Sequence, residues 1–447
     1  MQEELFYSGV RGIAVKILNR IEQTDAYLDK ILDYELKHSN LSSQDKALLY
    51  EIVHGVVRWE GKLDWILTGF MKGNFSKAML DIKNALRVAL YQILYLDKIP
   101  HYAALNEATE FIKKIHGQKY ANFVNALLRN IVNNLENIRF PDPEEKISYL
   151  TNTYSHPVWL VKKYLTMYEP DEIIKIMLAN NEKPKITLRV NRLVVNDDEF
   201  EKIMQNDDIE YVKTNYIKGF YQLKSLINIK NWKYFKEGYC NIQDESTGLS
   251  VNILDAKEGM RVLDMCAAPG GKTAYIAEKM KNTGEIVALD KFETRLNVLM
   301  TNLNRLKVTN VKPVVGDAAT YDECTFDRIL LDAPCSGLGT LSKKPDIKWK
   351  RTYSDILRLI DIQEKLLNNA AKLLKPSGIL VYSTCTTIPD ENDDVINKFL
   401  KNHPEFSIEK PDNIPSELVD DNGFVKTFPH IHRIDGSFCV KLRKNSE

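Results

Sequence analysis

The second half of the chain alternates short apolar runs with longer amphipathic stretches, and this alternation constrains the fold more than any other feature. The apolar runs are MRVLDMC, EIVALD, VKPVVGDA, FDRILLDAP and GILVYSTC, all after residue 258. Such alternation is typical of parallel strands joined by helices. We predict a doubly wound α/β sheet within residues 251–447, with a ligand bound beyond the carboxyl ends of its strands.

The first part of the chain instead carries apolar residues at helical spacing. In the clearest case, within 81–96, one stripe is formed by Ile82, Ala85, Leu86, Ala89, Leu90, Ile93 and Leu94. We predict an all-helical domain over residues 1–140, closed by a linker with two prolines and an acidic run at 138–145. A helical stretch near 157–178 and the strand-like ITLRVN at 186–191 indicate a small α+β connector over 141–250.

The composition excludes disordered and membrane-spanning classes of protein. Hydrophobic residues make up 44% of the chain and charged residues 27%, as in soluble folded proteins. The start lacks the basic region and apolar core of a signal peptide, so we expect a cytoplasmic protein that does not contact a membrane. The formal net charge is zero, so any contact with nucleic acid must come from a local basic patch. We expect a monomer.

The six cysteines include no C-x-x-C pair, so we expect no bound metal. In a chain without an export signal they are expected to be reduced thiols. We predict buried packing roles for Cys240, Cys324 and Cys439. Cys335 and Cys385 differ from these because each follows the end of a predicted strand.

A glycine-containing loop, DMCAAPGGKT at 264–273, joins the first predicted strand to a helix. Gly270 and Gly271 let a ligand approach the backbone closely, and the free amides at the helix start favour an anionic group. A nucleotide-binding P-loop is the competing interpretation. That motif needs a glycine five residues before the one that precedes the lysine, and this chain has Cys266 there.

Three acidic residues end three successive predicted strands: Asp264, Asp290 and Asp317. Asp290 follows the glycines by about 20 residues, the placement at which dinucleotide-type folds bind ribose hydroxyls. Each acid alone would be interpreted as a solvated loop residue or a helix cap. Together, beside the glycine loop, they favour a ligand site.

The motifs DMCAAPGGKT, LDAPCSGLGT and YSTCT resemble those of bacterial RNA cytosine-5 methyltransferases. The resemblance covers the whole chain, including QDESTGL at 243–249 and RIDGSFCVKL at 433–442. The most similar group is the ribosomal RNA small subunit methyltransferase B family. This resemblance implies a NusB-like helical domain, a small α+β connector and a Rossmann-like methyltransferase domain that uses S-adenosylmethionine.

The same resemblance implies roles for particular residues. Asp290 would bind the ribose of S-adenosylmethionine and Asp317 its adenine, and Asp332 would also have a binding role. The methionine part would be wrapped by Cys266, Ala267, Ala268, Pro269, Gly270, Gly271 and Lys272.

Methylation at carbon 5 of cytosine needs a nucleophile, because that carbon becomes reactive only after addition at carbon 6. A thiolate suits this step, since it both attacks and leaves readily. In DNA cytosine-5 methyltransferases the nucleophile belongs to a Pro-Cys motif, which would nominate Cys335. The resemblance to the RNA enzymes implies that Cys385 attacks and that Cys335 assists release. Asp332 is the expected partner of ring nitrogen 3, where negative charge develops.

A basic segment, LSKKPDIKWKR at 341–351, follows the Asp332 motif. Basic side chains neutralise phosphates and an aromatic ring can stack on a base. A solvated surface loop is the alternative. Its position next to the predicted active site favours RNA contact, through Lys343, Lys344, Lys348, Trp349, Lys350 and Arg351.

We therefore expect an enzyme that methylates carbon 5 of a cytidine in small-subunit ribosomal RNA through a covalent cysteine–cytosine intermediate. One alternative is a transfer-RNA methyltransferase with the same chemistry. A second is a non-enzymatic RNA-binding or antitermination factor, suggested by the helical front domain. Such a factor would have no use for the pair of cysteines and the acids at the strand ends.

Overall fold

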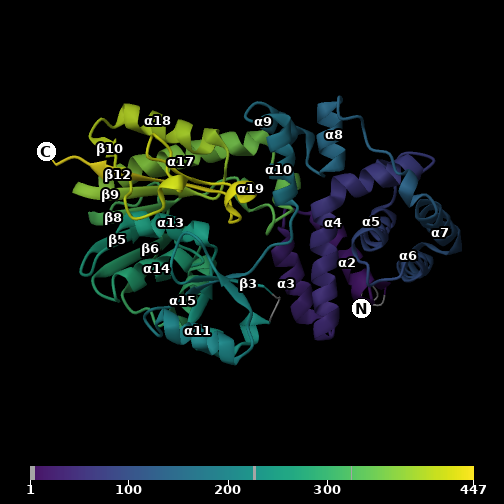
Figure 1. Ribbon diagram of the computed structural model, residues 1–447, viewed down its shortest axis with the longest axis horizontal. Helices are drawn as coiled ribbons and strands as arrows, with labels where there is room; N and C mark the ends of the chain where they lie inside the picture. The colour runs from purple at the N-terminus through teal and green to yellow at the C-terminus, as the bar shows by residue number, and fades with distance from the viewer. Residues whose placement is uncertain (1–5, 225–227, 324, 447) are drawn as a thin grey trace. The chain divides into compact units, whose positions relative to one another are not determined.

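The computed structural model describes residues 6–224, 228–323 and 325–446 (Figure 1). The chain forms two compact units. The helical unit comprises Met1–Glu182 together with Leu341–Thr352, and the sheet unit comprises Lys183–Thr340 together with Tyr353–Glu447. This division differs from the expected boundaries near residues 140 and 250.

One apolar core of the helical unit is formed by buried residues between positions 10 and 131. Within the described residues, no helix has the length and apolarity needed to cross a bilayer. The helices of the helical unit are α2 (Gly9–Gln23), α3 (Leu28–His38), α4 (Ser43–Phe70), α5 (Leu80–Tyr95), α6 (His101–His116), α7 (Gln118–Val132), α8 (Lys146–Thr153), α9 (Val158–Leu165), α10 (Pro170–Asn180) and the short α16 (Ile347–Lys350). The short helices η1 (Phe75–Lys77) and η2 (Leu135–Asn137) belong to the same unit.

The helix predicted within 81–96 is confirmed as α5, although its burial extends beyond the predicted stripe. Leu94 is only partly buried, whereas the polar residue Arg87 is buried. Arg87 is accommodated because its guanidinium pairs with Glu22 and Asp64, each at 2.6 Å. A buried charge is tolerated when it is paired in this way.

The predicted linker and the segment after it belong to the helical unit, because each forms a hydrogen bond with α4. The Gly61 amide donates to Ser155 Oγ at 3.0 Å, and Trp65 Nε1 donates to the Arg139 carbonyl at 2.9 Å. In this two-unit division the helices α8–α10 of the predicted connector lie in the helical unit and its strands lie in the sheet unit. The bounds 141–250 of the connector stay a prediction.

A small antiparallel sheet begins the sheet unit, with strand order β2-β3-β1-β4. The strand predicted at 186–191 is confirmed as β1. The part of the chain that forms this small sheet comprises β1 (Thr187–Val190), α11 (Asp197–Asn206), β2 (Tyr211–Lys213), β3 (Phe220–Leu223), η3 (Ile229–Asn231), α12 (Lys233–Lys236) and β4 (Cys240–Ile242).

The large sheet has the order β10-β12-β9-β8-β5-β6-β7, with β11 paired to β12. Strands β5 to β9 run parallel, β12 pairs antiparallel with β9, and β10 and β11 each pair antiparallel with β12. All five predicted apolar runs are confirmed as strands. They are β5 (Arg261–Asp264), β6 (Glu285–Asp290), β7 (Val311–Val315), β8 (Phe326–Asp332) and β9 (Leu374–Thr384), followed by β10 (Phe406–Ile408), β11 (Val425–Thr427) and β12 (Ser437–Lys444).

Helices cover both faces of this sheet, so successive strand residues enter different cores. Val262 packs in the core with α13–α15, whereas Leu263 packs in the core with α17 and α18. A strand buried on both faces is continuously apolar, which explains the runs in the sequence. The helices of this domain are α13 (Glu245–Leu254), α14 (Gly271–Lys279), α15 (Glu293–Arg305), α17 (Tyr353–Leu373), α18 (Asp393–Asn402) and α19 (Pro429–His432), with the short helices η4 (Leu338–Thr340), η5 (Pro389–Glu391) and η6 (Ser416–Leu418).

The strand order reverses beside β5. The chain passes from β5 outward through β6 to β7, then returns to β8 on the other side of β5. Ligands of doubly wound sheets bind at such a switch point, beyond the carboxyl ends of the strands. Here those ends are Asp264 of β5 and Asp332 of β8.

Candidate active site

The glycine loop connects β5 to α14 and is held from several sides. The Ala267 amide donates to the Leu289 carbonyl at 3.0 Å, and Arg295 donates to the Ala268 carbonyl at 2.7 Å. Gly270 has a φ of +99°, and a Cβ at this position would lie 3.0 Å from Leu299 Cγ. Both the backbone angle and the close packing therefore require glycine here.

Asp264, which ends β5, is almost fully buried. Its Oδ2 accepts a hydrogen bond of 2.7 Å from Thr273 Oγ1, the first-turn hydroxyl of α14. Burial raises the pKa of Asp264 to about 7. The residue thus joins the strand to the helix across the glycine loop and can exchange a proton near neutral pH.

Asp290 and Asp317 end the next two strands and have different surroundings. Asp290 is 3% exposed, accepts from the Phe292 amide at 3.1 Å and forms an ion pair of 3.0 Å with Arg295. Asp317 is exposed, and hydrogen bonds from the Ala319 amide and Lys291 lower its pKa. The buried acid can order a ligand, whereas the exposed acid can contact only a ligand that extends to the surface.

The donors and acceptors around the loop fit a cofactor with hydroxyl and amino groups. Asp264 Oδ1 is a buried oxygen without a hydrogen-bond donor among the described residues, whereas Asp290 Oδ2 meets Arg295 Nη1 at 3.0 Å. Buried acceptors are normally satisfied, so the unsatisfied Asp264 oxygen beside the glycine loop can accept from a bound molecule. These carboxylates suit the hydroxyls and ammonium of a nucleoside linked to an amino acid better than a triphosphate.

Cys335 and Cys385 are brought together by two neighbouring parallel strands, as their positions in the sequence predicted. Asp332 of β8 pairs in register with Ser383 of β9. The two sulfur atoms lie 3.2 Å apart, and the Cys385 amide donates to Cys335 Sγ at 3.3 Å. Hydrogen bonding to the Cys385 side chain, together with burial, raises the pKa of Cys335 well above its ordinary value. Cys335 is therefore held in the protonated form.

Lys272 and Asp332 link the glycine loop to the cysteine pair. Lys272 Nζ lies 2.6 Å from Asp332 Oδ2, and Ser383 Oγ donates to Asp332 Oδ1 at 2.9 Å. Burial lowers the pKa of Lys272, but the Asp332 carboxylate and Cys385 outweigh it, so the net pKa is raised. Lys272 thus remains a cation close to Cys385.

The sequence analysis does not predict some of the residues that shape this site. Thr273 and Ser383 orient the carboxylates of Asp264 and Asp332, and both stand inside the quoted motifs, which is the signal that could have identified them. Glu391 lies behind Cys335 and is fully buried. No local pattern distinguishes its carboxylate from the exposed acids that surround it in the sequence.

The other cysteines agree with their predicted packing roles where they are described. Cys240 is buried in the small-sheet core and Cys439 in the core beneath α13–α15. Cys324 lies outside the described residues. Cys266 is partly buried, and desolvation raises the pKa of its thiol, so it contributes packing to the loop and no thiolate.

The basic segment 341–352 lies within the helical unit, and three of its predicted RNA contacts need correction. Lys348 is 1% exposed and donates to the Arg58 carbonyl at 2.9 Å and to Asn181 Oδ1 at 3.0 Å. Burial and the Arg58 charge lower its pKa well below the ordinary value. Its amine is therefore unavailable to a phosphate. The sequence predicts that Lys348 contacts RNA, whereas residues distant in the chain enclose its side chain.

The side chains of Trp349 and Lys350 also donate hydrogen bonds within the helical unit. Trp349 Nε1 donates to the Val57 carbonyl at 2.7 Å, and its ring packs against the helical core. Lys350 Nζ donates to the Ile21 and Thr24 carbonyls at 3.2 and 2.8 Å. These contacts anchor the segment. Of the remaining predicted residues, Lys344 is exposed and Lys343 and Arg351 are partly buried.

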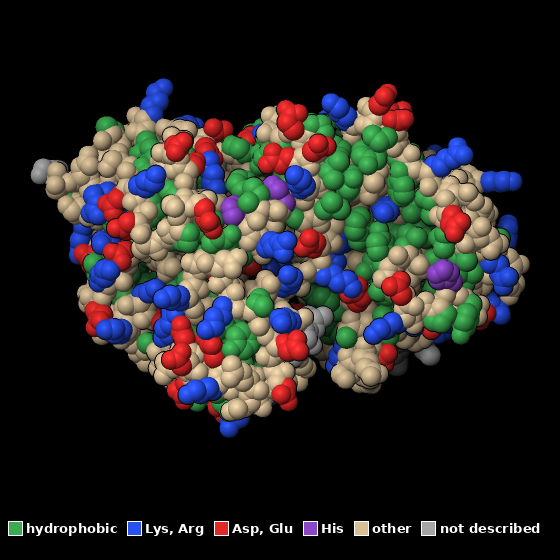
Figure 2. All heavy atoms as spheres, in the orientation of Figure 1, with side chains coloured by type: hydrophobic (Ala, Val, Ile, Leu, Met, Phe, Trp, Pro, Cys, Tyr) green, Lys and Arg blue, Asp and Glu red, His purple; other side chains and the backbone are tan. Residues whose placement is uncertain are grey.

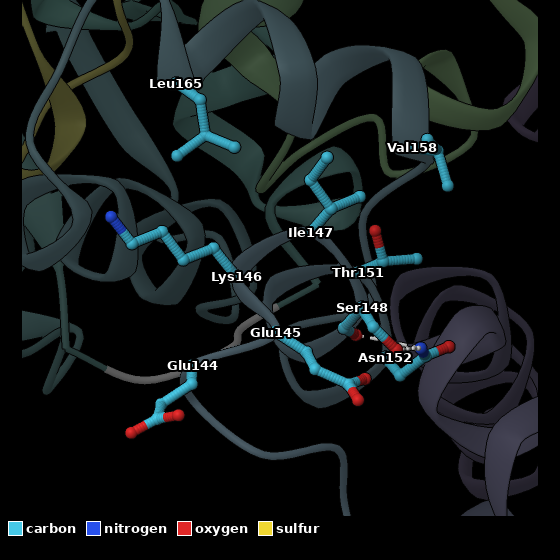
Figure 3. A pocket seen from close by; sticks show the side chains of 9 residues that line it. All are labelled: Glu144, Glu145, Lys146, Ile147, Ser148, Thr151, Asn152, Val158 and Leu165. Carbon is cyan, nitrogen blue, oxygen red and sulfur yellow. Dashed lines mark hydrogen bonds between the residues drawn. The ribbon is translucent and has the colours of Figure 1, made fainter.

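The surface charge is mixed on the face that Figure 2 shows, where basic and acidic side chains are interspersed. A separate hollow of about 780 Å³ lies in the helical unit, between α8, α9 and the preceding loop (Figure 3). It is lined by Glu144, Glu145, Lys146, Ile147, Ser148, Thr151, Asn152, Val158 and Leu165. None of the predicted site residues lines this hollow, so it does not compete with the strand ends as an active site.

Comparisons with known proteins agree with the architecture. Residues 251–443 match the family model described as 16S rRNA methyltransferase RsmB/F. Residues 8–133 match the NusB family, and residues 156–230 match the ferredoxin-like domain of RsmF/B-like methyltransferases. The all-helical front and the Rossmann-like sheet are thus both shown.

Whole-chain relatives extend this agreement. The probable ribosomal RNA small subunit methyltransferase B of Bacillus subtilis is 38% identical, over 98% of this chain and 99% of its own. The corresponding probable protein of Synechocystis is 33% identical, over 97% and 99%. The solved structure of PH0851 is 28% identical with a TM-score of 0.82, covering 98% of this chain and 99% of that one. The chain belongs to the ribosomal RNA small subunit methyltransferase B family.

Proposed function

We propose that this protein transfers a methyl group from S-adenosylmethionine to carbon 5 of a cytidine in 16S ribosomal RNA. The observation that supports this most is the approach of two thiols to 3.2 Å beside the Lys272–Asp332 pair. Family membership supports ribosomal RNA as the substrate, since the matching family model is described as a 16S rRNA methyltransferase. An RNA-binding factor without enzymatic activity would not need this arrangement of thiols.

The cofactor would be held by the loop 266–272, with Asp290 binding its ribose and Asp317 its adenine. The unsatisfied oxygen of Asp264 is suited to a donor on such a molecule. When bound, S-adenosylmethionine supplies an electrophilic methyl group on a positively charged sulfur. The glycine loop would hold that charge close to the buried acids, which would favour the cationic donor over its neutral product.

Catalysis would begin with addition of the Cys385 thiolate to carbon 6 of the cytosine. The new carbon–sulfur bond moves the electron pair of the carbon 5–carbon 6 bond to carbon 5, which then accepts the methyl group. Loss of the proton from carbon 5 and cleavage of the carbon–sulfur bond release the product. Covalent addition of this kind divides one high barrier into two lower ones.

Lys272 and Asp332 would support the attack on the base. A cation near Cys385 favours the thiolate over the thiol. Asp332 can share a proton with ring nitrogen 3, where negative charge develops as the thiolate adds. The same carboxylate is oriented by Ser383, so its position does not depend on substrate.

Cys335 would assist the breakdown of the covalent adduct. Its sulfur lies 3.2 Å from Cys385 Sγ and its thiol is held protonated. A neutral thiol beside the leaving sulfur can donate a proton to it. The Pro-Cys pattern of the DNA enzymes would instead make Cys335 the nucleophile, whereas the resemblance to the RNA enzymes assigns the attack to Cys385.

The experiment is methylation of defined RNA by the purified protein with S-adenosylmethionine labelled in its methyl group. We expect label in 5-methylcytidine from a 16S transcript, identified by nucleoside mass spectrometry, and none from a transfer-RNA pool. Bisulfite sequencing of RNA from cells with and without the gene then identifies the nucleotide. Label in transfer RNA alone, or in a nucleoside other than 5-methylcytidine, would overturn the proposal.

A further inference from the structure

A buried hydrogen-bond network contacts the loops that carry the two cysteines, and it is centred on two consecutive residues. Glu391 ends η5 and Asn392 precedes α18. Their exposed fractions are 0% and 3%, so both polar side chains are removed from solvent. Buried polar groups of this kind persist only where they are satisfied by specific partners.

Glu391 holds the loop that carries Cys335. Its Oε1 accepts from the Ser336 amide at 2.8 Å, and its Oε2 accepts from Ser336 Oγ at 2.5 Å. Gln363 of α17 donates both to Glu391 Oε1 at 3.1 Å and to the Pro334 carbonyl at 3.0 Å. The residues immediately before and after Cys335 are therefore both tied to this carboxylate.

Asn392 holds the loop that carries Cys385 in the same manner. Thr384 Oγ1 donates to Asn392 Oδ1 at 2.6 Å, and Asn392 Nδ2 donates to the Thr386 carbonyl at 3.0 Å. The residues on either side of Cys385 are thus fixed by one amide. The hydroxyl oxygens of Ser336 and Thr386 lie 2.9 Å apart and join the two halves of the network.

The network acts on the neighbours of the cysteines and leaves the sulfur atoms to the reaction. Directional hydrogen bonds on both flanks restrict each loop more closely than apolar packing, which tolerates small slips. Two thiols that must act in turn on one cytosine need this restriction. A displacement of about 1 Å in a reacting group can cost about 100-fold in rate.

We propose that Glu391 and Asn392 are positioning residues, which hold the loops of Cys335 and Cys385 so that both sulfur atoms reach one cytosine ring. The part of this inference that concerns catalysis rests on the proposed function. The part that concerns the distance between the sulfur atoms does not, and it is tested separately.

The first experiment measures that distance through the rate of disulfide formation in the full chain. Diamide takes up the two thiol hydrogens, becomes the hydrazine and leaves a Cys335–Cys385 disulfide, which peptide mapping identifies among the other cysteines. We expect Glu391→Ala and Asn392→Ala to slow this reaction at least tenfold. Glu364→Gln is the control, because Glu364 lies beside Gln363 on α17 but pairs with exposed Lys398. Equal rates in all four proteins would overturn the inference.

The second experiment measures covalent attack on RNA that contains 5-fluorocytidine, from which fluorine cannot leave as a cation. We expect adduct formation to fall about 100-fold in Glu391→Ala and about tenfold in Glu391→Gln, whose amide oxygen can still accept from the Ser336 amide. The KM for RNA and the affinity for S-adenosylmethionine should stay unchanged. Glu391→Gln also keeps the test valid if the alanine variant fails to fold.

The two experiments separate the two proposals. If the wild-type protein forms no adduct, the proposed function fails, while the oxidation rates still decide the role of Glu391 and Asn392. If the wild-type protein forms the adduct and the variants match Glu364→Gln in both assays, the positioning role is overturned and the proposed function stands. A fall in RNA affinity without a fall in the rate of adduct formation would also contradict the positioning role.

Discussion

Lys272 Nζ lies 2.6 Å from Asp332 Oδ2, and this ion pair joins the glycine loop to the strand that leads to Cys335. The lysine comes from the first turn of α14 and the aspartate from the end of β8. Residues 60 positions apart thus place one cation between the predicted cofactor loop and the predicted nucleophile. The site behaves as one electrostatic unit, which the following predictions test.

Lys272→Met should reduce covalent attack on RNA, because it keeps the length of the side chain but removes the charge that favours the Cys385 thiolate. We expect a fall of about 100-fold or more in the single-turnover rate, the scale of a lost charge-stabilising group. The exposed Lys398→Met variant serves as the control. A rate within threefold of wild type would remove Lys272 from the reaction.

The two cysteines should give different results when each is replaced. Cys385→Ala should abolish methylation and form no adduct, because no thiol attacks carbon 6. Cys335→Ala should attack but release product poorly, so a protein–RNA complex should survive denaturing electrophoresis. An adduct in Cys385→Ala instead would reverse the two roles, and full activity in both variants would exclude covalent catalysis by either thiol.

Asp264→Asn should stabilise the protein at alkaline pH. The folded state holds Asp264 at a pKa of about 7, above its ordinary value of 3.8, so the folded form binds the proton more tightly than the unfolded form. Stability is therefore lost as the pH rises from 4 to 7, by on the order of 4 kcal/mol. Thermal unfolding at pH 5 and pH 8 measures this.

The thermal unfolding midpoint of Asp264→Asn should exceed that of the wild-type protein at pH 8, and the difference between the two midpoints should shrink as the pH falls toward 4. The exposed Asp361→Asn variant should show no such dependence. A difference that is constant across this range would mean that Asp264 does not titrate near neutrality.

Asp290→Ala should weaken S-adenosylmethionine binding through lost ribose hydrogen bonds. Bonds to a charged acceptor contribute about 1.5–3 kcal/mol, which corresponds to about 10- to 150-fold in affinity. Calorimetry with the exposed Glu293→Gln variant as the control measures this. Unchanged affinity would exclude Asp290 from the site, and tighter binding of a nucleoside triphosphate would restore the P-loop interpretation.

Lys344→Ala and Lys348→Ala should separate solvated from enclosed lysines in the segment 341–352. Lys344 is exposed, so its loss should reduce the slope of log affinity against log salt by about 0.7–0.9, the value of one phosphate contact. Lys348 is enclosed, and its loss should leave that slope unchanged. Filter binding of 16S RNA over a range of salt concentrations is the measurement. Equal slopes for both variants would contradict this distinction.

The sequence by itself determined the elements of the fold and the candidate residues of the site. The apolar runs that became β5, β6, β8 and β9 are readable because strands buried on both faces must be continuously apolar, whereas β7 at the edge of the sheet is mostly exposed. The motifs at their ends are readable because parallel strands bring their carboxyl ends to one edge. The proximity of Cys335 and Cys385 follows from the same rule.

Only the tertiary structure decided which side chains face solvent and which partners they meet. Lys348 has the sequence environment of a solvated lysine, yet Arg58 and Asn181, far away in the chain, enclose it. Glu391 stands in an acidic run, yet Ser336 and Gln363 bury its carboxylate behind the active site. Periodicity reports local structure, whereas burial of a polar group depends on long-range partners that have no local signature.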